Sequence, residues 1–460
     1  MYRAPAIAAP SPILTLPTEM APKQRRRPRG GGRTPQESPA PDPAPVAGFT
    51  RGPRRLLLFT LGALIATVGI GAGLYSVVRG GGNTLTCDPD AKGWNAAGAG
   101  PANTADASAG IKDPGTGWAP SWSYPPRAAQ PSDRVTGPPS EAGGTVYTAT
   151  ATGTLVAIDA ATGREQWSSA PAAGEEGDVD TTIALDGCAA VLTTTQQSTA
   201  GEPAGVIRAV DLRSHQRRWA VNAADEIFSA PQIVDGVAYA GLSFAASSGP
   251  LDRTHVLDGY YLSDGTRAYR KTFSAAVTAS PTSDHQRIWI GALDQNLYGL
   301  GPQGRQLWTY QTNGIVTLPA MYQGGSVYIA SADHSVASLD PSTGHEHWNV
   351  SVGEIQAAMA VSGDTVVVAD VDGTVHALKA SDGSERWHAD MGAPVTRGVV
   401  AAGDRIFVID DEGVLHVLDR ATGNQTATWT APASPTGPPA IAAGHLYVAC
   451  QDGRLYALPL

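Results

Sequence analysis

The sequence predicts an all-β protein whose residues 118–460 form an eight-bladed β-propeller, and two observations support this. A unit of short apolar strand, tight turn, second strand and closing aromatic residue recurs along the chain, most clearly in TVYTATATGTLVAIDAATGREQW at residues 145–167. The closing aromatics, spaced 39 to 52 residues apart, are Trp122, Trp167, Trp219, Tyr269, Trp308, Trp348, Trp387 and Trp429. Repeats of roughly 40 to 50 residues built from short strands are typical of propellers, in which each blade is a four-stranded sheet.

Each repeat is expected to supply the four strands of one blade. Leu155 and Ala157 alternate with Val156 and Ile158, which is the period of two that a half-buried strand requires. The pair Asp372-Gly373 marks a tight hairpin, because glycine tolerates positive φ. An inner strand with a V-T-x-x-P-like string comes first, strands of VY and LYAL type follow, and the fourth strand carries the aromatic residue.

The last repeat is incomplete, and the first residues of the predicted domain supply what it lacks. Residues 445–460, HLYVACQDGRLYALPL, stop after the third strand, while Pro120–Tyr124 precede the first inner strand. We therefore expect the N-terminal strand around Trp122 to complete blade eight. This closure removes the open sheet edge that the ring would otherwise have.

The segments before the propeller differ from it in composition. Residues 1–50 are rich in Pro and Arg and are predicted to be a disordered cytoplasmic tail. Their basic run, Lys23–Arg29, either contacts anionic lipid head groups or is a solvated tail that enforces topology. Residues 80–117 are rich in Gly, Ala and Pro and are expected to form a linker.

Residues 51–79 are predicted to form a transmembrane signal anchor. Leu56–Val78 contains no charged residue, and a helix of this length would reach about 35 Å, enough to cross a bilayer core. Arg51, Arg54 and Arg55 precede this segment and only Arg79 follows it. We therefore expect a single-pass protein of the cell membrane, with its N-terminus in the cytoplasm and its propeller on the extracytoplasmic side. A cleaved signal peptide is the alternative, although its apolar region should be shorter and nearer to the chain start.

The charge and the cysteine content of the chain indicate which classes of binding partner and which kinds of chemistry are not expected. Residues 1–55 carry a balance of +7 and the remaining residues one of −17, so a nucleic-acid partner is not expected. Cys87, Cys188 and Cys450 form no CxxC pair, which argues against zinc or redox chemistry. In an exported domain, Cys87 and Cys188 are the expected disulfide; the alternative is that all three cysteines are reduced.

The repeat motif resembles that of a known family. Ala157-x-Asp159-x-x-Thr162-Gly163-Arg164-x-x-Trp167 is similar to the tryptophan-docking motif of the pyrroloquinoline-quinone-like (PQQ-like) propeller repeat. The resemblance implies that each closing aromatic packs between neighbouring blades. Many enzymes of this family hold the quinone beneath a disulfide between adjacent cysteines and bind calcium beside it. This sequence has no adjacent cysteines and only short blade links, so we predict no catalytic residues, no cofactor and no PQQ.

The mouth of the central channel is the remaining candidate site. The residue after the first apolar position of each inner strand gives a ring of Thr136, Asp180, Ser229, Thr278, Thr317, Gln356, Thr396 and Thr436. Asp180, Gln356 and the neighbouring Arg397 are candidate ligand-binding residues, because such polar rings can orient a small ligand or a peptide end. The alternative is a ring that merely holds water. No metal site is expected, since His345 and His347 lack a third ligand nearby.

These features favour a binding protein. Among relatives without enzymatic activity, the chain resembles the BamB-type propeller scaffolds of outer-membrane β-barrel assembly, which implies envelope proteins or peptides as partners. The rival interpretations are a PQQ-dependent quinoprotein dehydrogenase and the ectodomain of a sensor. Fold resemblance alone does not decide between them, because one fold can carry many functions.

Overall fold

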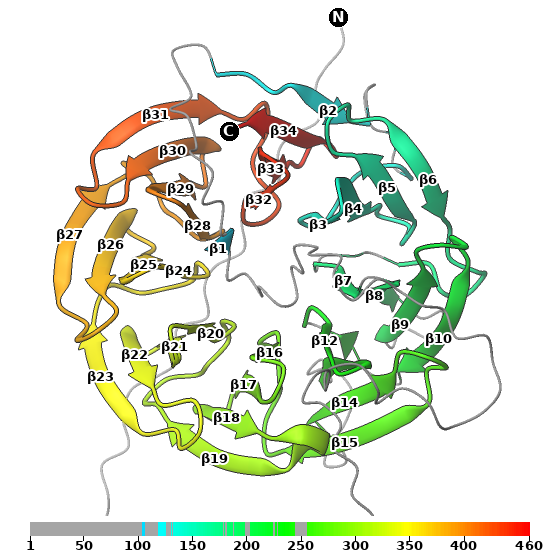
Figure 1. Cartoon of the computed structure of the whole chain (residues 1–460), viewed down its shortest axis with the longest axis horizontal. Helices are drawn as coiled ribbons and strands as arrows, with labels where there is room; N and C mark the ends of the chain where they lie inside the picture. Colours follow the sequence, from blue (N-terminus) through cyan, green and yellow to red (C-terminus); the bar gives the residue numbers. More distant parts are fainter. Residues whose placement is uncertain are drawn as a thin grey trace, which may run out of the picture. The chain divides into compact units, whose positions relative to one another are not determined.

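The propeller is built from eight antiparallel sheets arranged around a central axis (Figure 1). The computed structural model describes residues 104–105, 118–125, 130, 132–177, 179, 182–186, 188–197, 203–223, 226–227, 229–243 and 255–460. Within this part of the chain the predicted all-β, eight-bladed fold is confirmed. In each blade the first strand is innermost and the fourth lies at the periphery (Figure 1).

The first four blades follow one another along the chain. Blade one consists of β3 (Ser140–Ala142), β4 (Thr145–Ala149), β5 (Leu155–Asp159) and β6 (Glu165–Ser169). Blade two consists of β7 (Ala184–Asp186), β8 (Ala189–Gln197), β9 (Pro203–Asp211) and β10 (Arg217–Ala223). Blade three consists of β12 (Gln232–Val234), β13 (Val237–Ser243), β14 (His255–Tyr261) and β15 (Arg267–Phe273), with β11 (Glu226–Ile227) also paired to β13. Blade four consists of β16 (Thr282–Ser283), β17 (Ile288–Ala292), β18 (Asn296–Leu300) and β19 (Gln306–Gln311), with the 3-10 turn η1 (Pro302–Gly304) before β19.

The second four blades repeat the same order until the chain ends. Blade five consists of β20 (Met321–Gln323), β21 (Ser326–Ser331), β22 (Ser335–Leu339) and β23 (Glu346–Ser351). Blade six consists of β24 (Ala360–Ser362), β25 (Thr365–Ala369), β26 (Thr374–Lys379) and β27 (Glu385–Asp390). Blade seven consists of β28 (Val399–Ala402), β29 (Arg405–Ile409), β30 (Val414–Asp419) and β31 (Gln425–Thr430). Blade eight consists of β32 (Ala440–Ala442), β33 (His445–Ala449), β34 (Leu455–Pro459) and β2 (Trp122–Tyr124).

Strand β2 closes the ring as the outer strand of blade eight. It pairs antiparallel with β34, with Trp122 opposite Ala457 and Tyr124 opposite Leu455. The Trp122 ring centre lies 5.7 Å from that of Tyr447 on β33. The predicted closure by the N-terminal strand is therefore confirmed, and the outer edge of β34 is paired within the chain rather than left open.

A second N-terminal strand reaches the centre of the disc. β1 (Thr104–Ala105) pairs in parallel with β28, the innermost strand of blade seven, with Thr104 opposite Ala401 (Figure 1). Blade seven thereby gains a fifth strand on the side that faces the channel. The sequence did not predict this strand, because two residues carry no detectable period.

In several blades, aromatic residues on the second and fourth strands lie on either side of a small residue on the third. In blade one, Tyr147 and Trp167 both lie opposite Ala157, and their ring centres are 5.9 Å apart. In blade four, Gly299 lies between Trp289 and Trp308, and a Cβ on Gly299 would collide with the Trp308 indole. The third strand therefore needs a small residue at this position to leave room for the aromatic ring of the fourth strand.

The predicted membrane anchor cannot be compared with the described structure. Within the described ranges no helix is long and apolar enough to cross a membrane. Residues 1–50 and 51–79, including Leu56–Val78, lie outside the described residues, as does the linker 80–117 apart from residues 104–105. The assignments of a cytoplasmic tail, a spanning helix and a linker remain predictions.

Candidate functional site

The closing aromatics pack at the interfaces between neighbouring blades, which are called joints below. The Trp122 indole N–H donates to the carbonyl of Ala160 in blade one at 2.9 Å, and the ring lies against Gly163, whose φ is 68°. Asp159 holds this loop by accepting hydrogen bonds from the Thr162 amide at 2.8 Å and hydroxyl at 2.7 Å. These hydrogen bonds from Thr162 lower the pKa of Asp159. The docking motif of one blade therefore provides a carbonyl that accepts a hydrogen bond from the indole of the preceding blade, and a glycine without a side chain against which that indole packs.

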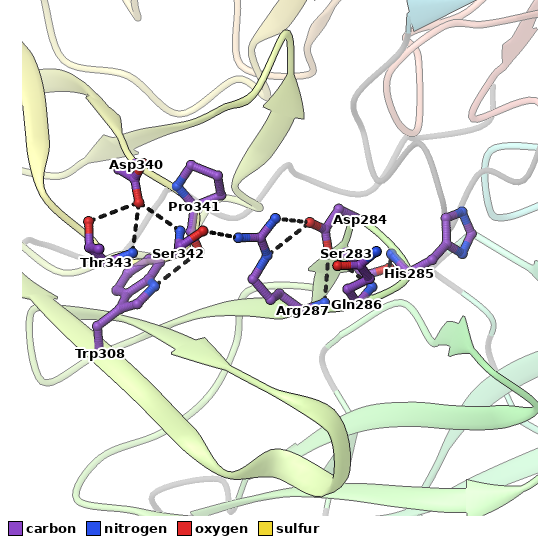
Figure 2. A network of polar contacts seen from close by, with 10 residues as sticks. All are labelled: Ser283, Asp284, His285, Gln286, Arg287, Trp308, Asp340, Pro341, Ser342 and Thr343. Carbon is purple, nitrogen blue, oxygen red and sulfur yellow. Dashed lines mark hydrogen bonds and ion pairs between the residues drawn. The ribbon is translucent and has the colours of Figure 1, made fainter.

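The same contact recurs around most of the ring. Indole N–H groups donate to the carbonyl of the next blade in the pairs Trp219–Leu262 at 3.0 Å, Trp308–Pro341 at 3.1 Å, Trp348–Ala380 at 2.9 Å and Trp387–Arg420 at 2.9 Å. Figure 2 shows the Trp308 joint, where Asp340 braces the loop through Thr343. Trp167 instead stacks on His215, which has φ 60°, with ring centres 4.3 Å apart.

Trp429 differs from the other predicted docking aromatics. It lies opposite Leu415, whereas the usual cross-strand position in blade seven, opposite Val417, is occupied by Ala427. The two extra residues between Gly423 and Trp429 cause this shift along the strand. Trp429 is still buried at the joint of blades seven and eight, where its ring centre lies 6.0 Å from that of Tyr456.

Trp118 takes the place that Trp429 leaves, and sequence analysis missed it. Its indole N–H donates to the carbonyl of Pro459 at 2.9 Å, and its ring lies 6.5 Å from Phe407, the second-strand aromatic of blade seven. It packs in the same apolar cluster as Ala427. The available signal was the pair of extra residues between Gly423 and Trp429, which moves Trp429 away from the usual docking position.

The ring of small polar residues at the channel mouth is largely engaged with the propeller itself. Thr136 donates to the Val179 carbonyl at 2.7 Å, Thr396 to the Asp411 carboxylate at 2.7 Å and Thr436 to the Ala449 carbonyl at 3.2 Å. The Ser229 hydroxyl accepts from the Gly241 amide at 2.7 Å. Four hydroxyls of the ring thus bind neighbouring groups of the propeller, whereas the buried Thr278 hydroxyl has no hydrogen-bond partner among the described residues.

The three candidate ligand-binding residues are not brought together by the described contacts. Asp180 lies outside the described residues. Gln356 is exposed and donates to Glu354 at 2.8 Å. Arg397 is partly buried, and its Nε has no hydrogen-bond partner among the described residues. The proposed role of these residues stays a prediction.

Tyr and His residues on the third strands brace the adjoining turns. Tyr298 donates to Asp294 and Tyr456 to Asp452, each at 2.6 Å. The His416 ring nitrogen lies 3.0 Å from Asp410 in the same manner. These contacts give the histidine and the carboxylates structural roles within their blades.

Cysteine and possible metal ligands add no further described site. Cys188 is disulfide-bonded and Cys450 is a buried free thiol. Cys87 lies outside the described residues, so the Cys87–Cys188 pairing stays a prediction. No group of three or more His, Cys, Asp or Glu side chains that could hold a metal ion occurs within the described ranges.

The described mouth residues do not suit a bound PQQ and calcium ion. Asp411 and Glu354 accept hydrogen bonds from Thr396 and Gln356. The ring of eight supplies only small hydroxyl and amide groups besides Asp180, with no aromatic face on which a quinone could stack. Calcium prefers several oxygen ligands, many of them carboxylates, and the described part of the chain contains no group of three or more His, Cys, Asp or Glu side chains that could hold it.

A cavity of about 650 Å³ lies between blades three and four. Tyr269, the only Tyr among the predicted docking aromatics, forms part of its wall. The sequence predicted Tyr269 as a docking residue but not the cavity beside it. The feature of the sequence that indicates a different joint here is the shortened loop Gly301–Gly304, which lacks the Asp and Thr of the docking motif.

Comparisons with known proteins agree with this fold. The sequence profile of the family described as outer membrane protein assembly factor BamB matches residues 108–201, 203–371, 313–392 and 371–459. BamB of Burkholderia pseudomallei (strain K96243) is 29% identical over 84 residues, which are 18% of this chain and 22% of that protein's length. The match thus spans about a fifth of this curated relative.

Solved structures show the same architecture at low sequence identity. BamB from Moraxella catarrhalis has a TM-score of 0.58 and 19% identity, over 75% of this chain and 100% of that one. Quinohemoprotein alcohol dehydrogenase from Comamonas testosteroni has a TM-score of 0.63 and 15% identity, over 82% and 81% of the two chains. These likenesses show the fold alone. Because the sequence profile covers most of the propeller, the chain belongs to the PQQ-like propeller family described as outer membrane protein assembly factor BamB.

Proposed function

We propose that this protein is a non-enzymatic binding scaffold that holds envelope proteins or peptides outside the cytoplasm. The observation that carries the proposal is the closed ring whose mouth hydroxyls bind the propeller's own groups, as Thr136, Thr396 and Thr436 do. Such a disc offers loops on a rigid frame, and loops on rigid scaffolds commonly carry binding function. Family membership supports the same conclusion, since the family's description is that of an assembly factor.

The proposal includes attachment to the cell membrane through Leu56–Val78, with the propeller on the outer side. The uncharged length of this segment and the arginines before it support this orientation. A disulfide at Cys188 is compatible with an oxidising compartment. The scaffold would then face other proteins of the envelope.

Crosslinking in intact cells tests the scaffold function. The full-length chain and a control limited to residues 1–117 are each crosslinked and purified, and the attached proteins are identified. We expect exported or membrane proteins on the full-length chain that are absent from the control. Identical sets on both would show that the propeller contributes no binding.

The dehydrogenase alternative rests on the fold likeness to a quinohemoprotein alcohol dehydrogenase. We propose that PQQ is not a cofactor here, which the donor set at the mouth supports. The test supplies full-length protein with PQQ and calcium and measures quinone binding and dye-linked oxidation of alcohols and sugars. We expect neither. Stoichiometric quinone uptake that Asp180→Ala abolishes would assign the chain to the oxidoreductases instead.

A further inference from the structure

The cavity between blades three and four combines aromatic walls with a charged rim. Tyr239, Tyr261 and Tyr269 line it together with the aliphatic residues Val234 and Ile288. Tyr239 is 5% exposed and Tyr261 is 49% exposed, so the tyrosines extend from the interior to the surface. The volume of about 650 Å³ is within the range of small-ligand sites.

The joint beside the cavity differs from the tryptophan joints in its docking contact. Tyr269 stands where the other joints have an indole, and its hydroxyl donates to the Gly304 carbonyl at 3.1 Å. The loop Gly301–Gly304 contains the short turn η1 in place of the longer docking motif. The cavity therefore lies beside the joint at which a tyrosine and a short turn stand in place of an indole and a docking loop.

The rings of Tyr239 and Tyr269 are tilted against each other rather than stacked. The ring centres of Tyr239 and Tyr269 are 6.3 Å apart, with an angle of 56° between the planes. Burial raises the pKa of Tyr239, and the charges of Asp235 and Tyr261 raise it further, so these groups lie within electrostatic reach of one another. Burial also raises the pKa of Tyr269, so the phenols of Tyr239 and Tyr269 are neutral near pH 7.

Asp235 supplies the charge of the site. It is the only Asp, Glu, Lys or Arg among the described residues that line the cavity, and it stands at the tip of the β12–β13 hairpin with φ 48°. Its carboxylate is exposed and makes no hydrogen bond or ion pair within the described structure. An acidic group beside aromatic faces, on a domain with a strong negative charge, favours a cation.

The opposite rim is held in place by a polar network. Asp284 accepts from the Arg287 guanidinium at 2.9 Å and from its backbone amide at 2.7 Å, and Arg287 also donates to Ser342 of blade five (Figure 2). This fixes the hairpin from which His285 extends away from Arg287 (Figure 2). His285 lines the cavity with φ 67°. The rim is therefore preformed.

We propose that this cavity binds an organic cation, a guanidinium or ammonium group on an apolar stem. The cation would lie against the tyrosine faces with Asp235 as its counter-charge, and the stem would contact Val234 and Ile288. Aromatic faces attract cations through the ring quadrupole, and more strongly where water is excluded. The same chemistry belongs to an arginine or lysine side chain of a polypeptide and to a free small amine, so the proposal does not depend on the scaffold function.

Calorimetric titration of the full-length protein tests the site with three probes. These are a blocked glycine-arginine-glycine tripeptide, the same tripeptide with citrulline in place of arginine, and free agmatine. We expect the citrulline peptide, a neutral isostere, to bind at least about ten-fold more weakly than the arginine peptide. Equal binding of both peptides would overturn the proposal. An arginine peptide that binds more tightly than agmatine identifies a polypeptide side chain, and the reverse order identifies a free cation.

Variants tie the binding to the cavity. Asp235→Asn and Tyr261→Ala, both at exposed positions, should each weaken binding of the arginine peptide about ten-fold. Tyr322→Ala is the matched control, because Tyr322 is 38% exposed but lies on β20 and does not line the cavity. Unchanged thermal unfolding of the variants shows that they are folded. Full-strength binding by folded Asp235→Asn would contradict the proposal.

Discussion

Gly299 shows how closely a single residue can control the packing of a blade. It separates Trp289 from Trp308, and a Cβ there would collide with the Trp308 ring. We expect Gly299→Ala to lower the free energy of unfolding by about 1 to 3 kcal/mol, since overpacking forces neighbouring side chains to move. Denaturant titration measures the change. Gly437→Ala is the control, because its Cβ would lie 3.5 Å from Pro138, an ordinary contact; equal losses would argue against a packing cause.

The state of the cysteines can be counted by thiol titration. Cys450 is fully buried, and burial raises the pKa of its thiol to about 12. At pH 8 the native protein should therefore not react with a thiol reagent at this residue, because the thiolate is the reactive form. After unfolding without reductant we expect one thiol per chain if Cys87 and Cys188 are paired. Three thiols would refute the disulfide.

Asp211 should make part of the stability depend on pH. It is 6% exposed; burial raises its pKa, but hydrogen bonds from the Ser214 amide and the Arg218 side chain outweigh this and bring the pKa to about 2. Its folded pKa lies below its unfolded value near 3.9, so its contribution is present above pH 4 and lost as the pH falls towards 2. We expect Asp211→Asn to cost about 1 to 2 kcal/mol at pH 7 and much less at pH 2.5. A cost independent of pH, measured by denaturant titration at both values, would contradict this.

At the scale of single elements, the joint of blades seven and eight differs most from the repeat. The Trp118 indole N–H donates there to the Pro459 carbonyl of β34, and blade seven carries Ala427 where other blades carry an aromatic residue. Trp118 fills that place from the other end of the propeller. The sequence motif groups Trp429 with the docking aromatics, because the motif does not show that two inserted residues move a side chain along its strand.

Strand β2 should stabilise the whole ring. Trp122 packs on Tyr447 and donates to Ala160, so it joins blade eight to blade one. We expect Trp122→Ala to lower the free energy of unfolding by about 3 kcal/mol or more, the usual cost of removing a large packed ring. Trp118→Ala should cost less, about 1 to 2 kcal/mol, because Trp118 lies outside any strand. Thermal unfolding measures both, and wild-type melting of Trp122→Ala would mean that β2 does not close the ring.

At the scale of the whole molecule, the topology prediction is open to a direct test. Arg51, Arg54 and Arg55 before Leu56–Val78 should keep the N-terminus in the cytoplasm. Protease added to cells with a permeabilised wall should then degrade the propeller and spare an N-terminal tag. Immunoblotting for tags at both ends measures this. Loss of the N-terminal tag with protection of the C-terminal one would reverse the orientation.

Much of the architecture was present in the sequence. The recurring aromatics and the alternation around Leu155 specify the blades, because a strand's faces follow directly from a period of two. The missing fourth strand after Leu460 and the PSWSY segment at Pro120–Tyr124 likewise specified the closure. Local sequence patterns are sufficient to predict the blades, since each blade repeats the same short strands and turns.

Only the tertiary structure decided which side chains meet between blades. The sequence left open whether the ring at the channel mouth orients a ligand or holds water, and it did not show that the hydroxyls of Thr136, Thr396 and Thr436 bind groups of the propeller itself. Tyr269 looked like one more docking residue, yet it borders a cavity with Tyr239 and Asp235. A period along the chain fixes the face on which a residue lies. Its partners across a joint depend on loop lengths and ring sizes in two blades at once, which no local pattern records.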